Sequence, residues 1–511
     1  MSMEMPIWFV PPRRGSEPEA DVCLIAEGCY PYVSGGVSTW IDWLIRSHPD
    51  LTFSVLAILP GLPQTEPRYQ RPANLKAIHH LYLDDRGKGQ RRSWPAMTPQ
   101  WYADTLDSIL AHGDPDAFHA LLGKFGPAGR RPSVSTMLDS PQAWQALSAG
   151  YARMPQTAFI AYFWAWRVLA GGLLRTLVGP LPGARLYHSV STGYAGLVAA
   201  RAAHDTGRPV MITEHGIYSN ERRVEILMAD WIKNSIDTGL DFSDERHDIR
   251  DFWADAFESF ARIAYSAADD VIALYGDNNA FQLALGADSK KLTVVPNGVD
   301  VDRFDTLPAR VSKRPTLAFI GRVTPIKDVQ TFIDVAERAA SKVAGLRALV
   351  IGPMDEDPDY AQSCIEAVNE RGLADTVIFT GPVDVRDYMA EIDVLMLTSI
   401  SEALPLVILE AGASGIPCIA TDVGACKEIL GCPGRPEEAA IAGIGGMVAP
   451  VGDVGSLVSA AVHMLNNPFV RQQMGAELRA KVRIQYRSDT VAAAYTKLYS
   501  KHLSQFAKSE V

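Results

Sequence analysis

The stretch DVLMLTSISEALPLVILEAGASGIPCIATD, residues 393–422, contains a strand, a helix and a second strand in succession. The runs at its two ends, 393–399 and 417–422, are short and rich in apolar residues, which is typical of buried parallel strands. Pro405 suits the first turn of a helix, where its missing N–H would lack an intrahelical partner anyway. Gly415 suits the position just past a helix end. We therefore expect a helix from Pro405 to the residue before Gly415.

The same alternation extends in both directions along the chain. Helical segments separate further short apolar runs, which predicts parallel sheets covered by helices on both faces. The expected strands are 21–26, 51–59, 184–190, 209–213 and 269–275 in the first half, which the segment 291–300 closes, and 316–321, 347–352 and 376–381 in the second. The predicted fold class is therefore α/β, with two Rossmann-like, doubly wound lobes that face a central cleft.

The pattern also predicts the division of the chain. Residues 1–298 are expected to form an N-terminal lobe, interrupted by a mostly helical insertion at about 62–180 that is rich in Gln, Trp, Arg and Pro. Residues 299–484 are expected to form the C-terminal lobe, with 299–315 as the linker. A final helical segment, 485–511, is expected to pack back on the N-terminal lobe.

Composition excludes several classes of protein. The 511 residues are 47% hydrophobic and 21% charged, which rules out a disordered or fibrous chain. Lys plus Arg number 48 and Asp plus Glu number 59, so the net charge is −11. That balance argues against a general nucleic-acid binder, which needs a basic surface for phosphates. The negative net charge does not exclude a local cationic pocket that binds one anionic ligand.

The cysteines and the N-terminal sequence indicate the cellular location that we expect for the protein. None of the six cysteines forms a C-x-x-C pair, which is typical of a reduced, cytosolic protein. The first residues lack a basic segment followed by an apolar core, so we expect no signal peptide. Residues 157–178 are the most apolar stretch, but arginines and glycines interrupt it. We interpret it as a buried core helix. A contact for a membrane-bound partner, or a membrane span, are the alternatives.

Two carboxylates surround the helix expected after Pro405. Glu402 precedes its N-terminus, and Glu410 lies about one and a half turns inside it. A helix N-terminus suits a phosphate or a polar sugar, because its N–H groups are free and carry partial positive charge. Glu402 could then accept hydrogen bonds from sugar hydroxyls, and Glu410 from a ribose. The structural alternative makes Glu402 a helix cap and Glu410 a solvated residue.

Two cations follow the strand expected at 316–321. Arg322 comes directly after it and Lys327 five residues later. Both should therefore lie at the carboxyl end of a parallel strand, where α/β proteins bind ligands. The forked guanidinium matches phosphate oxygens, and the lysine adds a point charge, so together they could neutralise a diphosphate without a metal. Two ordinary surface cations are the alternative.

The pair Gly35–Gly36 stands at the head of the first expected helix. Glycines let a backbone approach a ligand closely, and the helix N-terminus favours anions. An ordinary turn would also account for the two glycines, so the pair alone is weak evidence for a ligand site.

These motifs, taken together, resemble the retaining glycosyltransferases of family 4, which have the GT-B fold. The resemblance rests on G-R-x4-K after a strand, E-x7-E around a helix start, and VVPNGVD at 294–300, and it covers about residues 290–465. The segments EGCYPYVSGGVSTWIDWLI (27–45) and TEHGIYSNER (213–222) further resemble the PelF-type cytosolic glycosyltransferases of bacterial Pel exopolysaccharide assembly.

The resemblance implies a nucleotide-sugar donor, UDP-glucose for this type, and no other cofactor. Arg322 and Lys327 would bind its diphosphate. Glu402 would hold the sugar and Glu410 the ribose. It also implies a polysaccharide acceptor, and it leaves open a membrane-bound export or synthase complex that recruits the protein to the inner membrane face.

The resemblance also implies which backbone segments contact the donor. The uracil base would lie against Gly381, Pro382 and Val383. Gly35 and Gly36 match the loop of the acceptor-side N-terminal lobe that faces the sugar and phosphates.

One departure from the family concerns the loop after the first glutamate. It is commonly Gly-Phe-Gly-Leu, whereas here it is Ala403-Leu404-Pro405-Leu406. Because Pro405 has no N–H, contacts to the donor would come from amides such as those of Leu404, Leu406 and Val407.

Histidines offer further candidates. His215 follows an expected strand, on the face where the cleft should open, with Tyr218 and Arg222 nearby. It could contact the transferring sugar or the acceptor, and a structural role is equally open. His188 is a weaker candidate.

No metal site is predicted from the sequence. Asp300 and Asp302 have D-x-D spacing but fall in the expected linker, and the run Gly443-Ile-Gly445-Gly446 does not fit a dinucleotide loop.

The sequence therefore predicts a metal-independent, retaining hexosyltransferase. Cations and helix N-termini would stabilise the departing UDP, and no carboxylate nucleophile is required. A sugar-nucleotide epimerase or a phosphorylase on the same fold is the alternative among enzymes. A two-lobed sugar-binding protein without activity is the alternative outside them.

Overall fold

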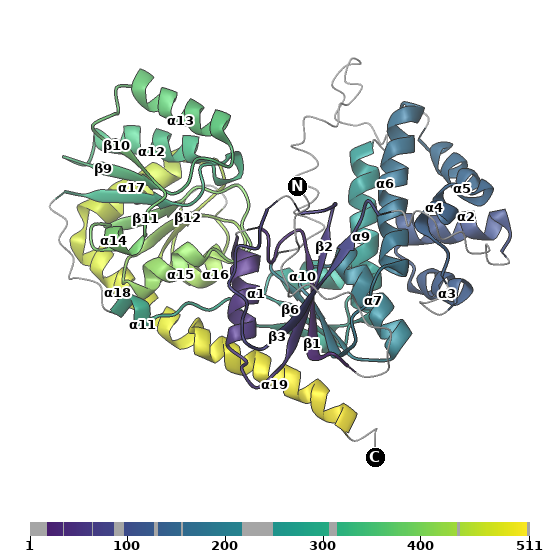
Figure 1. Ribbon diagram of the computed structural model, residues 1–511. Coiled ribbons are helices and arrows are strands. Elements are labelled where there is room, and N and C mark those ends of the chain that lie inside the picture. Colours follow the sequence, from purple (N-terminus) through teal and green to yellow (C-terminus); the bar gives the residue numbers. More distant parts are fainter. Residues whose placement is uncertain are drawn as a thin grey trace. The chain divides into compact units, whose positions relative to one another are not determined.

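The computed structural model describes residues 18–33, 35–63, 65–85, 97–126, 131–154, 157–216, 249–305, 314–436 and 440–507. They form two compact units (Figure 1). The first contains Met1–Ala273, Asn278–Val294 and Tyr495–Val511, and the second contains Leu274–Asp277 and Val295–Ala494.

The first unit is built on a seven-stranded parallel sheet of order β3-β2-β1-β4-β5-β6-β7. The order reverses direction at β1, as in doubly wound folds. The strands are β1 (Ala20–Glu27), β2 (Phe53–Leu59), β3 (Leu75–Tyr82), β4 (Ala184–Ser189), β5 (Val210–Glu214), β6 (Asp270–Ala273) and β7 (Leu292–Val294). Among the described residues, the helices between these strands include α1 (Gly36–Arg46), α7 (Tyr194–Thr206), α9 (Ile249–Ala267) and α10 (Asn278–Ala284).

Strand β3 departs from the sequence expectation, because it lies inside the stretch expected to be mostly helical. Leu75, Ile78 and Leu81 are buried, and β3 pairs in parallel with β2 along its length. Two histidines in its middle conceal the apolar pattern. One of them, His79, is buried beside Glu19, whose carboxylate lies 3.1 Å from its ring. The helical insertion therefore begins after β3.

The insertion is a set of helices whose boundaries follow from local sequence. It comprises α2 (Pro99–Asp107), a π-helical turn η1 (Ser108–His112), α3 (Pro115–Phe125), α4 (Val134–Leu138), α5 (Pro141–Tyr151) and α6 (Phe159–Val178). Thr98, Asp114, Ser133 and Ser140 each cap a helix by accepting a hydrogen bond from its first turn. Three of these caps are followed by proline, which pre-sets the first helical residue.

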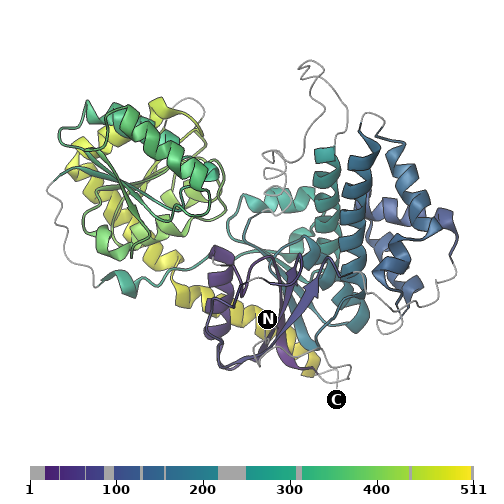
Figure 2. The same ribbon diagram turned by 45° about the horizontal axis from the view of Figure 1, so that its top comes forward.

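Helix α6 is the apolar stretch of the sequence and runs beside α9 in both views (Figures 1 and 2). Its C-terminal part is buried through Leu169, Leu173 and Leu177, whereas Ile160 and Trp164 are exposed. The interpretation as a helix that contributes to the core is therefore confirmed for this part. No helix in the described ranges has the length and apolarity required to cross a bilayer.

The second unit is built on a seven-stranded sheet of order β10-β9-β8-β11-β12-β14-β13, parallel except for β13 at its edge. The strands are β8 (Thr316–Ile320), β9 (Arg347–Ile351), β10 (Val377–Gly381), β11 (Val394–Leu397), β12 (Cys418–Thr421), β13 (Ile441–Ala442) and β14 (Gly446–Ala449). Separate apolar cores lie on its two faces. Both units thus confirm the α/β, doubly wound prediction.

The helices of the second unit have the following bounds. They are α11 (Asp302–Asp305), α12 (Val329–Ala340), α13 (Pro358–Glu370), α14 (Arg386–Met389), α15 (Leu406–Ala413), α16 (Cys426–Leu430), α17 (Val454–Asn466) and α18 (Pro468–Gln485), followed by α19 (Ser488–Ala507). Helix α15 begins and ends within one residue of its predicted limits. Helix α11 was not predicted, because the sequence there was interpreted as a linker.

The end of α19 belongs to the first unit. The hydroxyl of Tyr499 lies 2.9 Å from His188 on β4. Lys501 and His502 both bond the carboxylate of Asp270, the first residue of β6. These bonds join the C-terminal part of the helix to the sheet.

Close packing of two strands accounts for Gly446 in the run Gly443-Ile-Gly445-Gly446. A Cβ at this residue would lie 1.8 Å from the carbonyl oxygen of Cys418 on β12. The run therefore allows β14 to pair closely with β12, and it has a structural role.

We expect Gly446→Ala to lower the unfolding midpoint, because the added methyl group cannot fit without moving backbone. Overpacking of this kind costs about 1–3 kcal/mol. Thermal unfolding followed by circular dichroism measures the shift. Gly434→Ala is the control, since a Cβ there meets nothing within 4 Å. Equal unfolding midpoints for Gly446→Ala and Gly434→Ala would contradict the structural role of Gly446.

Candidate active site

Most of the candidate residues of the second unit lie at one edge of its sheet. Arg322 follows β8, Gly381 ends β10, and Glu402 lies in the loop after β11. In the sheet, β8 neighbours β11, and only β9 separates β8 from β10. Because all four strands are parallel, their carboxyl ends meet at the same edge, which is where such sheets bind ligands.

The central contact of this edge is an ion pair between Lys327 and Glu402. The Lys327 Nζ contacts Glu402 Oε1, and the hydroxyl of Ser399 donates to the same oxygen at 2.7 Å. Only 18% of the lysine side chain and 12% of the glutamate side chain are exposed. Partial burial strengthens such a pair relative to a surface pair. The two residues predicted to act on the donor thus lie side by side.

A second set of bonds fixes the loop of Lys327 against the end of β11. The hydroxyl of Thr398 donates to the carbonyls of Lys327 and Asp328, at 3.1 and 2.9 Å. The N–H of Ile400 donates to the carbonyl of Ile326 at 2.9 Å. Asp328 has a φ of 47°, in the left-handed region. The position of Lys327 therefore depends on residues about seventy positions away in sequence.

Gly424 supports the loop of Glu402 from the other side. A Cβ at this residue would lie 2.1 Å from the carbonyl oxygen of Ala403 and 2.4 Å from that of Glu402. The next N–H, of Ala425, donates to the Ala403 carbonyl at 2.8 Å. Sequence reasoning missed Gly424, although its place just after an expected strand end, in TDVGA, was the available signal.

Arg322 lies at the same edge but has a different partner. Its guanidinium contacts the carboxylate of Glu356, which follows β9. About half of each side chain is exposed. An exposed ion pair is worth little, so an anionic ligand could replace Glu356 at small cost. Among the described residues, no hydrogen bond or ion pair joins Arg322 to Lys327 or Glu402.

Helix α15 brings its N-terminus to this edge. Pro405 is its N-cap residue, and no side chain caps the helix. The amides of Leu406 and Val407 belong to the first turn, where intrahelical acceptors are lacking. Leu404 is buried in the apolar core below. The helix can therefore offer backbone N–H groups to a ligand oxygen.

Glu410 occupies an unusual environment on α15. Burial raises the pKa of its carboxyl to about 7, with Arg303 opposing the shift and Asp384 adding to it. Arg303 lies on α11, in the stretch that sequence reasoning treated as a linker. The carboxyl therefore changes charge near neutral pH, which an exposed glutamate does not do.

The segment Gly381-Pro382-Val383 leaves the sheet at the end of β10. Gly381 has a φ of 69°, and its carbonyl accepts from the N–H of Gly352 at 3.2 Å. Val383 is exposed. An exposed apolar side chain at the carboxyl edge of the sheet suits a flat heterocyclic base.

In the first unit, Gly36 begins α1 and Gly35 precedes it in an extended conformation. A Cβ at either residue would meet nothing within 4 Å. Protein packing therefore does not require glycine at these positions, and the space beside them is open.

His215 follows β5 in the same unit. Its ring meets Trp40 of α1 edge to face, with centroids 4.4 Å apart. Burial lowers the pKa of His215 to about 3, so the imidazole is neutral at pH 7. Its Nε2 has no hydrogen-bond partner among the described residues. A buried nitrogen without a partner is rare in proteins and marks a position to which a ligand could bind.

His188 is a structural residue, which corrects its candidacy. It is fully buried on β4, with Nδ1 2.9 Å from the hydroxyl of Tyr499 and Nε2 2.8 Å from that of Thr213. Neither nitrogen can then bind a ligand. Tyr218 and Arg222 lie outside the described residues.

No group of three or more histidine, cysteine or acidic side chains that could hold a metal occurs in the described ranges. Asp302, of the pair Asp300 and Asp302, forms an ion pair with Arg487 at 3.2 Å. All six cysteines are free.

Solved structures resemble this chain in fold. The crystal structure of Anabaena Alr3699/HepE in complex with UDP aligns with 94% of this chain and 100% of its own, at 14% identity and a TM-score of 0.56. Sucrose-phosphate synthase from Thermosynechococcus elongatus aligns with 94% and 99%, at 16% identity and a TM-score of 0.57. The chain therefore has the GT-B fold that was predicted.

Curated relatives match part of this chain. N-acetyl-alpha-D-glucosaminyl L-malate synthase of Bacillus anthracis is 28% identical over 184 residues, 36% of this chain and 44% of that protein. D-inositol 3-phosphate glycosyltransferase of Nocardia farcinica is 34% identical over 154 residues, 27% of this chain and 34% of that protein. The matches thus span between a third and a half of these relatives.

Two family models cover most of the chain. One, described as "Glycosyl transferases group 1", matches residues 314–467, which include Arg322, Lys327, Glu402 and Glu410. The other, described as "Domain of unknown function (DUF3492)", matches residues 20–290, more than half of the chain. The chain therefore belongs to the DUF3492 family, and residues 314–467 of its second unit match the group 1 glycosyl transferase model.

Proposed function

We propose that this protein is a retaining, metal-independent glycosyltransferase that moves glucose from UDP-glucose to a growing exopolysaccharide, as PelF-type enzymes do. The observation that carries the proposal is the partly buried ion pair of Lys327 with Glu402, beside the N-terminus of α15. It combines a cation for the diphosphate with a carboxylate for the sugar. The crystal complexes of Anabaena Alr3699/HepE with UDP and with UDP-glucose, on the same fold, support this class of donor.

In this proposal the diphosphate binds between Arg322, Lys327 and the first turn of α15. Arg322 exchanges the exposed carboxylate of Glu356 for a phosphate oxygen, and Lys327 adds a second positive charge. As the bond from the sugar to the diphosphate breaks, negative charge accumulates on the leaving UDP. Preorganised cations and amides stabilise that charge more in the transition state than in the ground state.

Glu402 then accepts hydrogen bonds from hydroxyls of the donor sugar. The lysine and the Ser399 hydroxyl both bond one carboxylate oxygen, Oε1, and so orient the group. An oriented carboxylate holds the sugar at a fixed angle to its leaving group, which lowers the entropic part of the barrier.

Glu410 accepts the two hydroxyls of the ribose in its ionised form. The base lies against Val383 and the backbone of Gly381. From the first unit, Gly35 and Gly36 allow close approach of sugar and phosphates. The neutral imidazole of His215 offers one hydrogen bond to the sugar or the acceptor without adding charge.

Retention of configuration follows from attack on the face that UDP leaves. The acceptor hydroxyl forms the new bond to the anomeric carbon while the bond to the diphosphate breaks, and the departing phosphate oxygen takes the hydroxyl proton. No protein nucleophile is needed, which agrees with the proposed roles of both glutamates as binding groups.

Lys327→Met and Glu402→Gln test this proposal directly. Each removes one partner of the ion pair, and we expect transfer from UDP-glucose to fall about 100-fold or more, as for other groups that stabilise transition-state charge. UDP release measures the rate. Arg471→Met is the matched control, since Arg471 pairs with Asp393 at the opposite edge of the same sheet. Folded variants with normal rates would sink the proposal.

Glu410 predicts a pH dependence of donor binding. Its raised pKa of about 7 means that about a tenth of the carboxyls are ionised at pH 6 and about nine-tenths at pH 8. If the ionised form binds the ribose, UDP-glucose should bind about tenfold more tightly at pH 8 than at pH 6. Titration calorimetry at both pH values measures this ratio.

Glu410→Gln should abolish the pH dependence, because the amide does not titrate. Glu366→Gln, a change of an exposed glutamate on α13, should leave it intact. UDP-glucose is the suitable probe, since its diphosphate is esterified at both ends and gains no proton in this range. A wild-type affinity that is the same at both pH values contradicts the role of Glu410.

A further inference from the structure

Glu356 holds the guanidinium that the proposed function assigns to the diphosphate. It follows β9, and its two carboxylate oxygens both contact Nη1 of Arg322. No other hydrogen bond or ion pair involves either side chain within the part of the chain that the structure describes. A carboxylate of the protein therefore occupies the group that a phosphate oxygen of the donor would need.

The loop after β9 packs closely on the loop after β8. It begins at Gly352, which has a φ of 148°, and a Cβ there would lie 2.0 Å from the carbonyl oxygen of Gly321. Next along the loop, the carbonyl of Pro353 accepts the N–H of Val323 at 3.0 Å. Because Gly321 and Val323 flank Arg322, the two loops are joined on both sides of the arginine.

Helix α13 fixes the other end of the same loop. Its N-cap residue, Asp357, accepts the N–H of Tyr360 at 3.0 Å, and Pro358 follows as the first helical residue. Glu356 directly precedes this cap, so its backbone is held in place. When a ligand displaces it from Arg322, the side chain can turn away, but the carboxylate stays within the screening length of about 8–10 Å from the bound anion.

The helix does not explain why residue 356 is acidic. Acidic side chains stabilise a helix N-terminus, which accounts for the N-cap Asp357 and for Asp359 in the first turn of α13. The carboxylate of Glu356 forms no cap and contacts Arg322 instead. The role of Glu356 is therefore to be sought in its contact with the arginine.

Donor and product should respond to Glu356 differently. Either of them must displace the carboxylate from Arg322 to reach the guanidinium. The diphosphate of UDP-glucose is esterified at both ends, whereas UDP ends in a free phosphate, which takes a second negative charge above a pH of about 6. Because like charges repel, the displaced carboxylate disfavours UDP more than UDP-glucose.

We propose that Glu356 is a specificity-determining residue that discriminates against the product, because it competes with the diphosphate for Arg322 and repels UDP more strongly than UDP-glucose. This inference rests on the proposed function, since it takes UDP-glucose as the donor. The exposed ion pair is weak, so it lowers the affinity for the donor only a little. The pair re-forms as UDP leaves, and the site can then bind the next donor.

Glu356→Gln tests the proposal in the full chain, by calorimetric titration with UDP and with UDP-glucose at pH 8. We expect UDP-glucose to bind about two- to fivefold more tightly to the variant, the worth of one exposed ion pair. UDP should gain at least about twofold more than UDP-glucose, because the variant also removes a charge that repels its free phosphate. Inhibition of transfer by UDP should become stronger in the same proportion.

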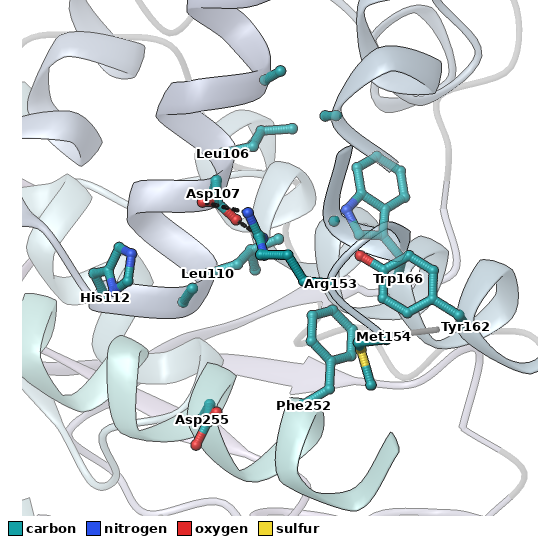
Figure 3. A pocket seen from close by; sticks show the side chains of 14 residues that line it. Leu106, Asp107, Leu110, His112, Arg153, Met154, Tyr162, Trp166, Phe252 and Asp255 are labelled. Carbon is teal, nitrogen blue, oxygen red and sulfur yellow. Dashed lines mark hydrogen bonds and ion pairs between the residues drawn. The ribbon is translucent and has the colours of Figure 1, made fainter. Parts of the chain in front are cut away.

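Two other carboxylates serve as matched controls. Asp355→Asn removes the same charge from the neighbouring exposed residue of the loop. Asp107→Asn breaks a comparable ion pair, that of Asp107 with Arg153, which lines a cavity of about 370 Å³ in the helical insertion (Figure 3). None of the residues predicted to bind the donor lines that cavity. Because neither change frees Arg322, both variants should bind UDP and UDP-glucose within about twofold of the wild-type affinity.

A double-mutant cycle with Arg322→Met separates competition from repulsion. In the Arg322→Met background no guanidinium is left to compete for, so Glu356→Gln should change the affinity for UDP-glucose by less than about twofold. The repulsion remains, so UDP should still bind more tightly after the change.

The outcomes separate this inference from the proposed function. Unchanged affinities in Glu356→Gln, equal gains for UDP and UDP-glucose, or the same gains in Asp355→Asn would overturn the role of Glu356. A full gain for UDP-glucose in the Arg322→Met background would overturn it as well. A wild-type protein that binds neither ligand would contradict the proposed function and this inference with it. Binding of both ligands without any effect of Glu356→Gln would overturn the inference and leave the proposed function standing.

Discussion

The ion pair of Lys327 with Glu402 is the contact on which the candidate site of the second unit depends. It joins the loop after β8 to the loop after β11, and both side chains are largely withdrawn from water. Removing one member would leave the other charge without its partner in a half-buried place, which is costly. The hydroxyls of Ser399 and Thr398 add bonds to the same two loops. The site is therefore preorganised before any ligand binds.

This preorganisation contrasts with the position of Arg322 and Glu410. Arg322 has an exposed partner that an anion can displace, and Glu410 has a carboxyl whose charge responds to pH near neutrality. At this edge of the sheet, the Lys327–Glu402 pair is thus fixed, whereas Arg322 can change its partner and Glu410 its charge. Under the proposed function, the fixed pair would hold the sugar and the two adjustable residues the nucleotide, which would let the enzyme bind UDP-sugar and then release UDP.

In the helical insertion, the limits of the helices and their packing have different origins. Its helices begin at side-chain caps followed by proline, so their limits are local properties of the sequence. Their packing is not local, because the absence of a side chain at Gly150 on α5 makes room for the hydroxyl of Tyr162 on α6. The insertion adds to the sheet of the first unit a surface that the doubly wound fold alone does not provide.

The sequence by itself determined the α/β class, the limits of α15 and the order of the motifs, because apolar period, proline and glycine act over a few residues. It missed β3, whose histidines interrupt the apolar run, and α11, which a linker-like composition conceals. Only the tertiary structure decided that Lys327 meets Glu402 while Arg322 meets Glu356, that His188 is structural, and that Glu410 is buried enough to shift its pKa. Ion-pair partners and desolvation depend on residues far apart in the chain, which no local pattern encodes.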